Sequence, residues 1–170
     1  MADSTAKKIR KVDPIRTASF EVLQYGLKIT YNTLMIIIFS LLIGIVLNKT
    51  HEVIISMLSF ALLRFFSGGF HLKSSDRCVA LSVSMILLIA FTNFLPDYLY
   101  EYINFLTLLV LLKFAPSNIH IKTKKSFNQK FVFKSISLIL VITNITLIGN
   151  QIIAVAFFIQ SLTTIYNRSE

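Results

Sequence analysis

The stretch YNTLMIIIFSLLIGIVL, residues 31 to 47, carries no charged side chain over 17 residues. A helix needs about 20 predominantly apolar residues to cross a hydrocarbon core of about 30 Å. Five further apolar runs follow, at residues 53 to 70, 79 to 95, 98 to 115, 132 to 149 and 151 to 166. Because unpaired backbone groups are costly in lipid, helices are the favourable structure for such runs. The sequence therefore predicts an all-α, polytopic membrane protein, a helical bundle with about six transmembrane helices.

The composition agrees with a membrane protein and restricts its partners. Hydrophobic residues make up 55% of the 170 residues, and tryptophan is absent. The net charge of +9 comes from Lys and Arg residues that cluster between apolar runs rather than spreading over a soluble face. This pattern favours anionic lipid or an acidic peptide as partner, and it argues against nucleic acid. The single cysteine excludes an internal disulfide and a multi-cysteine metal site, and we expect no metal and no cofactor.

The region before the first apolar run, residues 1 to 30, forms a separate unit. It begins with a basic tail, and it lacks the continuous apolar core of a cleavable signal peptide. Apolar residues then recur at helical spacing, which predicts an amphipathic helix on the membrane surface over residues 14 to 29. The alternative is that this segment extends the first membrane-spanning helix. We expect residues 31 to 166 to form one transmembrane domain.

The charge distribution predicts an orientation in the cell membrane. If the amino terminus is cytoplasmic, the loops at residues 64 to 78 and 113 to 134 and the carboxyl terminus are cytoplasmic too. Of the 17 Lys and Arg residues, only Lys49 then lies outside, as the positive-inside rule requires. An arrangement with four spans and two re-entrant pairs keeps the same cytoplasmic loops and differs over residues 144 to 166.

The first of these loops, RFFSGGFHLKSSDRC at residues 64 to 78, contains His71 and the only cysteine, Cys78. A thiol becomes a strong nucleophile when a base takes its proton or when nearby positive charge stabilises the thiolate. His71 can act as the base, while Lys73 and Arg77 supply positive charge. The alternative is an inert interfacial cysteine beside a solvated histidine, because a Cys and a His seven residues apart form a weak pattern.

Geometry places a condition on this pair. On one straight helix, residues seven apart are separated by about 10 Å along the axis, which is too far for a hydrogen bond. The chain between His71 and Cys78 must therefore fold back, or the pair must form across two protomers. SGG before the histidine and KSSD after it favour a break. We therefore predict that no unbroken helix runs from Phe66 to Ala80.

Four other residues of this loop have two interpretations each. Arg64, inside an apolar run, is a functional candidate that could bind a substrate carboxylate or carbonyl, or it could snorkel to the interface. Gly68 and Gly69 could supply amide donors for an oxyanion, or they could simply open the loop. Asp76 could orient His71, although an aspartate at the start of a helix is commoner.

The second cytoplasmic loop, residues 113 to 134, is strongly basic and contains no acidic residue. Its lysines could bind an acidic peptide segment, or they could hold the loop against anionic lipid. The candidates for substrate binding are Lys122, Lys124, Lys125 and Lys130 of this loop, together with Lys73 and Arg77 of the first loop.

Taken together, the arginine, the Gly-Gly-x-His and the cysteine seven residues after the histidine resemble the core motif of the AgrB family of accessory gene regulator proteins. The resemblance extends to Ala115-Pro116, the lysine-rich loop, the amphipathic amino-terminal region and the overall length, so it covers most of the chain. The second loop reads SNIHIKTKK and lacks a proline that is often found further on in the family.

The resemblance implies an integral-membrane cysteine endopeptidase that processes an AgrD-type propeptide in quorum sensing of Gram-positive bacteria. It implies that His71 is the general base and Cys78 the nucleophile, with Arg64 and Gly69 as supporting positions. It further implies a propeptide with an amphipathic amino-terminal helix and an acidic tail, a thiolactone or lactone product, and a homodimer.

Two functions of other classes compete with this one. The chain could be a non-enzymatic peptide exporter or channel in which Cys78 is incidental, or a membrane scaffold that docks partners through its basic loops. A related peptidase could also hydrolyse its substrate without closing a ring.

Overall fold

The computed structural model describes residues 5, 7, 19–70, 74–92, 96–117 and 127–165. Within these ranges the chain is almost entirely helical and forms no strand. The helices are α2 (Phe20–Val46), α3 (Thr50–Ser67), α4 (Ser75–Ala90), α5 (Asp97–Phe114), α6 (Phe127–Thr143) and α7 (Gln151–Ile165), with a π-helical turn, η1 (Asn144–Ile148), after α6. The predicted all-α, membrane-type fold is therefore confirmed.

Helix α2 departs from the sequence prediction at its beginning. It runs without interruption from Phe20 to Val46, so residues 20–29 are the first turns of the same helix that contains the first apolar run. The structure thus follows the alternative, an extended first helix, and the prediction of a separate surface helix is wrong for residues 20–29. No helix-breaking signal lies at the junction, where the Thr30 hydroxyl donates a hydrogen bond to the Gly26 carbonyl inside the helix. Residues 14–18 lie outside the described ranges.

Among the residues that the structure describes, three helices are long and apolar enough to cross a membrane, namely α2, α3 and the continuous segment Asn128–Ile148. Helix α7 is apolar but has only 15 residues, and α4 has 16. Helix α5 has 18 residues and includes Asp97, Glu101 and Lys113. The prediction of about six spans is therefore supported for three of them by length and composition.

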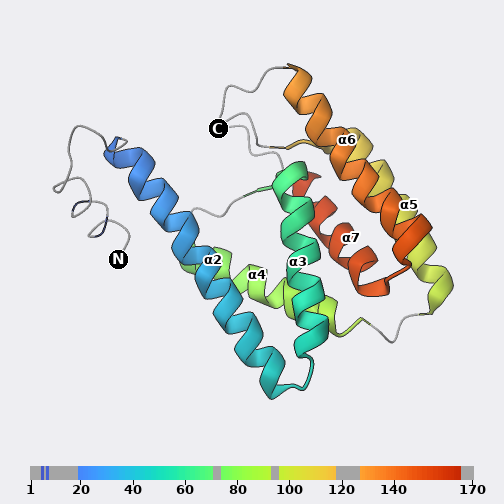
Figure 1. Cartoon of the computed structure of the whole chain (residues 1–170), viewed down its shortest axis with the longest axis horizontal. Coiled ribbons are helices and arrows are strands. Elements are labelled where there is room, and N and C mark those ends of the chain that lie inside the picture. Colours follow the sequence, from blue (N-terminus) through green and yellow to red (C-terminus); the bar gives the residue numbers. More distant parts are fainter. Residues whose placement is uncertain are drawn as a thin grey trace.

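Helix α3 lies at the centre of the bundle and packs against α2, α4, α6 and α7 (Figure 1). Helix α5 packs against α6 and α7. The largest apolar core cluster joins Phe60 of α3 to Ile89 of α4, Tyr100 of α5 and Ile152 of α7. In contrast, α2 leaves large apolar side chains exposed, including Leu42 and Val46, which suits contact with lipid.

The C-terminal ends of α3, α5 and α7 lie at the same end of the molecule (Figure 1). Three backbone hydrogen bonds connect them there: Ser117 N–H to Ser67 O at 2.9 Å, Gly69 N–H to Ser117 O at 3.3 Å, and Phe70 N–H to Thr163 O at 3.2 Å. The segments that follow α3 and α5 are the starts of the two loops predicted to be cytoplasmic. Their contact is consistent with that prediction, while the orientation relative to the cell remains a prediction.

Candidate functional site

The chain turns sharply after α3 at the glycine pair. Gly68 has φ 73° and Gly69 has φ 137°, values that L-residues with side chains rarely adopt. Helix α3 ends at Ser67 and α4 begins at Ser75, so no continuous helix connects Phe66 to Ala80. The predicted break in the helix is confirmed.

Gly69 has no room for a side chain. A Cβ atom built there would lie 2.5 Å from Thr163 Oγ1 and 3.3 Å from Gln160 Nε2, both on α7. The N–H groups of Gly68 and Gly69 already donate to Arg64 O at 3.0 Å and to Ser117 O at 3.3 Å. Because both donors are engaged, the structure favours the turn-forming role of the glycines over the oxyanion role.

The segment after α5 forms the other side of this turn. Gly68 and Ser117 make an isolated parallel bridge, directly after the cis peptide bond between Ala115 and Pro116. The Ala115-Pro116 pair therefore lies beside the glycine pair, although Gly68 and Ala115 are 47 positions apart in the sequence (115 − 68). The sequence gives no local sign of this contact.

The guanidinium of Arg64, in the last turn of α3, donates hydrogen bonds to two other residues of this chain. Its Nη2 donates to the carbonyl oxygen of Phe70 at 2.6 Å, and its Nη1 donates to Gln160 Oε1 at 3.3 Å. The guanidinium carbon lies 5.9 Å from the ring centroid of Phe60, a cation–π distance. Arg64 therefore points into the bundle and holds the chain that follows the glycine turn, which speaks against the snorkelling interpretation.

Cys78 lies at the end of the first turn of α4. Its backbone N–H donates to Ser74 O at 3.1 Å, which is the first hydrogen bond of the helix. Ser74 is the residue directly before the first residue of α4. The thiol is free and the residue is half-buried. Ser74 is thus the N-cap residue of α4, but its side chain makes no capping hydrogen bond.

Cys78 shares a small cavity with Arg64 and with the end of the glycine turn. The cavity measures about 10 Å³, which is about the space of one water. The lining residues are Phe60, Arg64, Phe70, Cys78, Leu81, Ser82, Met85 and Thr163.

Several predicted site residues lie elsewhere or outside the described ranges. His71, Lys73, Lys122, Lys124 and Lys125 are outside those ranges. Phe70, the residue before His71, is described and lines the cavity of Cys78. Arg77 is exposed on α4, Asp76 is exposed as well, and Lys130 is half-buried on α6. Within the described part of the chain, no group of three or more His, Cys, Asp and Glu side chains could hold a metal ion.

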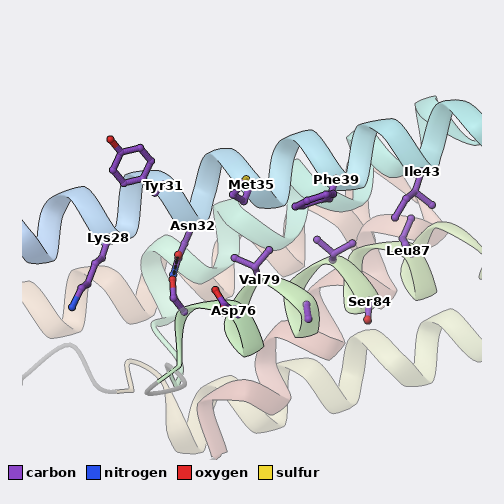
Figure 2. A pocket seen from close by; sticks show the side chains of 13 residues that line it. Lys28, Tyr31, Asn32, Met35, Phe39, Ile43, Asp76, Val79, Ser84 and Leu87 are labelled. Atoms are coloured by element: carbon purple, nitrogen blue, oxygen red, sulfur yellow. Dashed lines mark hydrogen bonds between the residues drawn. The ribbon is translucent and has the colours of Figure 1, made fainter. Parts of the chain in front are cut away.

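A larger groove runs between α2 and α4 (Figure 2). Its volume is about 750 Å³. One end is polar, with Lys28, Tyr31 and Asp76, and there the Ser75 hydroxyl is hydrogen-bonded to Asn32 Oδ1. The rest is mainly apolar and is lined by Met35, Phe39, Ile43, Val79, Ala80, Val83 and Leu87.

Helix α4 therefore presents two different faces. Residues 78, 81, 82 and 85 line the cavity of Cys78, whereas residues 76, 79, 80, 83 and 87 line the groove. These two sets follow helical spacing on separate sides of one helix. Cys78 is thus within a helical turn of the groove without lining it.

Sequence reasoning missed Gln160, Ser117 and Thr163. Gln160 is fully buried, and its Nε2 donates to Gly68 O at 2.7 Å and to Ser67 Oγ at 3.2 Å. The available signal was a glutamine in the middle of the apolar run at residues 151 to 166, since a buried amide needs partners. Nothing in the sequence identified α3 as the helix that supplies them.

Comparison with known proteins points in one direction. The family model described as accessory gene regulator B matches residues 2–164. AgrB-like protein 2 of Clostridium perfringens strain 13 is 32% identical over 118 residues, which are 62% of this chain and 55% of the relative. An AgrB-like protein of Halalkalibacterium halodurans is 28% identical over 116 residues, which are 68% of this chain and 59% of the relative. The chain spans little more than half the length of these curated relatives, and no solved structure matches it.

Proposed function

This chain belongs to the accessory gene regulator B (AgrB) family, and from that premise we propose that it is a membrane cysteine endopeptidase acting on an AgrD-like propeptide. The proposed reaction cleaves the peptide bond before the carboxyl-terminal tail of the propeptide and promotes closure of a thiolactone or lactone ring. Cys78 is the proposed nucleophile and His71 the proposed general base. We further propose that the reaction takes place at the cytoplasmic face of the cell membrane of a Gram-positive bacterium.

One observation carries the proposal, namely that Phe70 and Cys78 line the same cavity. The dyad requires the chain after the glycine turn to return to the first turn of α4. Phe70 directly precedes His71 in the sequence, and its backbone N–H and carbonyl are both hydrogen-bonded near this cavity. The contact occurs within one chain, which supports a dyad inside a single protomer over one formed across two protomers.

The positive charge of Arg64 is the second support. The guanidinium lines the same small cavity as Cys78. A nearby cation stabilises the thiolate, which is the nucleophilic form. Arg77 and Lys73 are in the same segment by sequence and would add to the local positive charge.

The cleavage step follows from this chemistry. His71 takes the thiol proton, and the Cys78 sulfur attacks the carbonyl carbon of the scissile bond. The C–N bond then breaks, and the proton passes from His71 to the leaving amine of the tail. The products are the free tail and a thioester between the propeptide and Cys78.

Ring closure uses a nucleophile of the bound peptide. His71 takes the proton of a cysteine or serine side chain of the propeptide, and the sulfur or oxygen attacks the thioester carbonyl carbon. The C–S bond to Cys78 then breaks, and Cys78 leaves as the thiolate, which regains its proton from His71. A tethered nucleophile can reach an effective concentration on the order of 10⁵ M, so it can compete with water. Because amide-to-thioester exchange is uphill, we expect reversible cleavage that removal of the products drives forward.

The proposed partners are the propeptide and anionic lipid. An acidic tail would complement the basic loop at residues 113 to 134, which contains six Lys and no acidic residue. Lys130, Lys122, Lys124 and Lys125 are the proposed contacts in this loop, and the same lysines could also contact anionic headgroups.

The test is cleavage by the purified protein in liposomes that contain anionic lipid. The substrate is a synthetic propeptide with an amphipathic amino-terminal helix, an internal cysteine and an acidic tail, taken from a short reading frame beside the gene. Mass spectrometry should detect the released tail, the ring, and a covalent adduct on Cys78 that hydroxylamine removes.

Three variants complete the experiment. Cys78→Ala and His71→Ala should form neither the adduct nor the tail, whereas Ser82→Ala, a change in the same cavity, should retain both. Undiminished cleavage by Cys78→Ala would overturn the enzyme mechanism. An exporter would be indicated instead if Cys78→Ala transported the peptide across the liposome membrane and the wild type did not cleave it.

A further inference from the structure

Gln160 of α7 joins the two elements that hold the glycine turn. Its side chain is fully buried. Its oxygen accepts a hydrogen bond from Arg64 Nη1 at 3.3 Å, and its nitrogen donates to Gly68 O at 2.7 Å and Ser67 Oγ at 3.2 Å. The amide of glutamine has one oxygen and two N–H donors, and all of them are used here.

These contacts reach the proposed site through Arg64. The same guanidinium that contacts Gln160 donates from Nη2 to the carbonyl oxygen of Phe70 at 2.6 Å. The N–H of Phe70 donates to Thr163 O at 3.2 Å, three residues further along α7 than Gln160. Both backbone groups of the residue before His71 are thus fixed by Arg64 and α7.

We propose that Gln160 is a positioning residue for the Cys78 site, acting through Arg64 and the Gly68 carbonyl to hold the backbone that enters His71. This inference rests on the proposed function, because it assumes that His71 serves Cys78. Gln160 does not itself line the small cavity of Cys78, but it contacts two residues that do, Arg64 and Thr163. It fixes the guanidinium on one side and the turn on the other, so that Phe70 remains against the helix of Cys78.

The side-chain chemistry explains why glutamine suits this position. Glutamate would keep the acceptor for Arg64 but would lose the two donors to Gly68 and Ser67. Leucine and methionine have a similar volume but can make none of the three hydrogen bonds. Leucine or methionine would leave the half-buried Gly68 carbonyl and one guanidinium N–H without the partner that Gln160 provides.

The experiment uses the fact that the chain has only one cysteine. Alkylation by iodoacetamide therefore reports on Cys78 alone, and the rate follows the fraction of thiolate. In the wild type, a thiol activated by His71 should react near neutral pH, and His71→Ala should move the rate profile toward the higher pH of an isolated thiol. In Gln160→Leu we expect a displacement in the same direction, with a rate at pH 7 about tenfold lower than that of the wild type.

Ser161→Ala is the matched control. Ser161 is the next residue of α7, is also fully buried, and donates only to Phe158 O of its own helix at 2.7 Å. The substitution Ser161→Ala removes a buried hydrogen bond of α7 and leaves the contacts of Arg64 and of the glycine turn unchanged. We expect its alkylation profile to match that of the wild type.

Kinetics with the propeptide give a second readout. Loss of positioning should lower kcat for tail release about tenfold or more while KM stays within about twofold, because the basic loop proposed to bind the acidic tail is unchanged. A general loss of folded protein is measured independently by gel filtration in detergent, and all rates are expressed per molecule of folded protein. If Gln160→Leu does not fold in detergent, Gln160→Met provides the same loss of hydrogen bonds with a more flexible side chain.

The outcomes are distinguishable. If His71→Ala has the same alkylation profile as the wild type, the proposed dyad fails. If His71→Ala shifts the profile but folded Gln160→Leu and Gln160→Met do not, and kcat is unchanged, the dyad stands and the positioning role of Gln160 is overturned. An equal shift in Ser161→Ala would also overturn it, because any defect in α7 would then have the same effect.

Discussion

Arg64 donates a hydrogen bond from Nη2 to the carbonyl oxygen of Phe70 at 2.6 Å. Phe70 is six positions further along the chain, and the glycine turn lies between the two residues. This bond connects the last turn of α3 to the residue before His71. A short charge-assisted bond of this kind is about twice as strong as a neutral one. This guanidinium therefore holds the carbonyl of the residue before His71, while Thr163 O holds its N–H.

The first prediction concerns Arg64→Lys. A lysine keeps the positive charge near Cys78, but its single ammonium cannot reproduce the fork that contacts both Phe70 O and Gln160 Oε1. Loss of one hydrogen bond to a charged group costs about 1.5–3 kcal/mol. We expect the initial rate of tail release in liposomes to fall roughly 10- to 100-fold. Lys49→Arg, a basic exchange in the turn between α2 and α3, should leave the rate unchanged, and equal losses in both variants would contradict the prediction.

The second prediction concerns Gly69→Ala. Its φ of 137° is strained for alanine, at about 1–3 kcal/mol, and the new Cβ would lie 2.5 Å from Thr163 Oγ1. We expect tail release to fall at least about tenfold, because the turn must shift away from α7. The measurement is the rate per molecule of folded protein, with folding checked by gel filtration in detergent.

A double variant separates the two causes in Gly69→Ala. Thr163→Ala removes the hydroxyl that the new Cβ would meet, and by itself it loses only a hydrogen bond to Gln160 O within α7. Gly69→Ala with Thr163→Ala should recover part of the lost rate, because the clash is relieved while the backbone strain remains. Full activity of Gly69→Ala alone would show that the turn tolerates a side chain.

The course of the helices was largely predictable from the sequence. Apolar runs gave the helices within a few residues, and SGG with KSSD gave the break between α3 and α4. The start of α2 was not predictable, because an amphipathic pattern and an extended transmembrane helix share the same 3.6-residue period. Only the absence of a breaker near Thr30 favours the continuous helix.

The site was predictable only in its local part. Arg64, Gly69 and Cys78 lie within one segment, so their types and spacing indicated a site. Gln160 and Ser117 join it through contacts between residues 49 to 96 positions apart in the chain (117 − 68 and 160 − 64), which no local pattern encodes. The role of Gln160 depends on which helix packs beside α3, and one sequence does not specify that packing.

The third prediction concerns the packing of α2 on α3 at Gly44. This glycine is buried, and a Cβ built there would lie 3.1 Å from Val53 Cγ2. Small residues allow close approach of membrane helices, so we expect Gly44→Leu to separate them and to lower the thermal unfolding temperature in detergent. Overpacking of this kind costs about 1–3 kcal/mol.

Gly26 provides the matched control on the same helix. A Cβ there would meet nothing within 4 Å, so Gly26→Ala should leave the unfolding temperature unchanged or raise it. Alanine is favoured over glycine inside a helix by about 0.5–1 kcal/mol. If Gly44→Leu unfolded at the same temperature as Gly26→Ala, the close contact between α2 and α3 would be incorrect.

The last prediction concerns Asn144, which closes the turn between η1 and α7. Its Nδ2 donates to Asn150 O at 3.2 Å, and its Oδ1 accepts from Asn150 N–H at 3.3 Å, while the side chain is almost fully buried. Asn144→Ala would remove both of these hydrogen bonds; Asn150 O still accepts from Ala154 N–H, whereas Asn150 N–H loses its acceptor, at a cost of about 1–3 kcal/mol. We therefore expect a clear decrease in the thermal unfolding temperature, whereas Thr146→Ala, which removes an exposed hydroxyl bonded only to Ile142 O, should have little effect. Because this turn lies at the opposite end of α7 from Gln160, tail release per folded molecule should remain near the wild-type rate in Asn144→Ala, and a large loss of kcat there would show that the two ends of α7 are coupled.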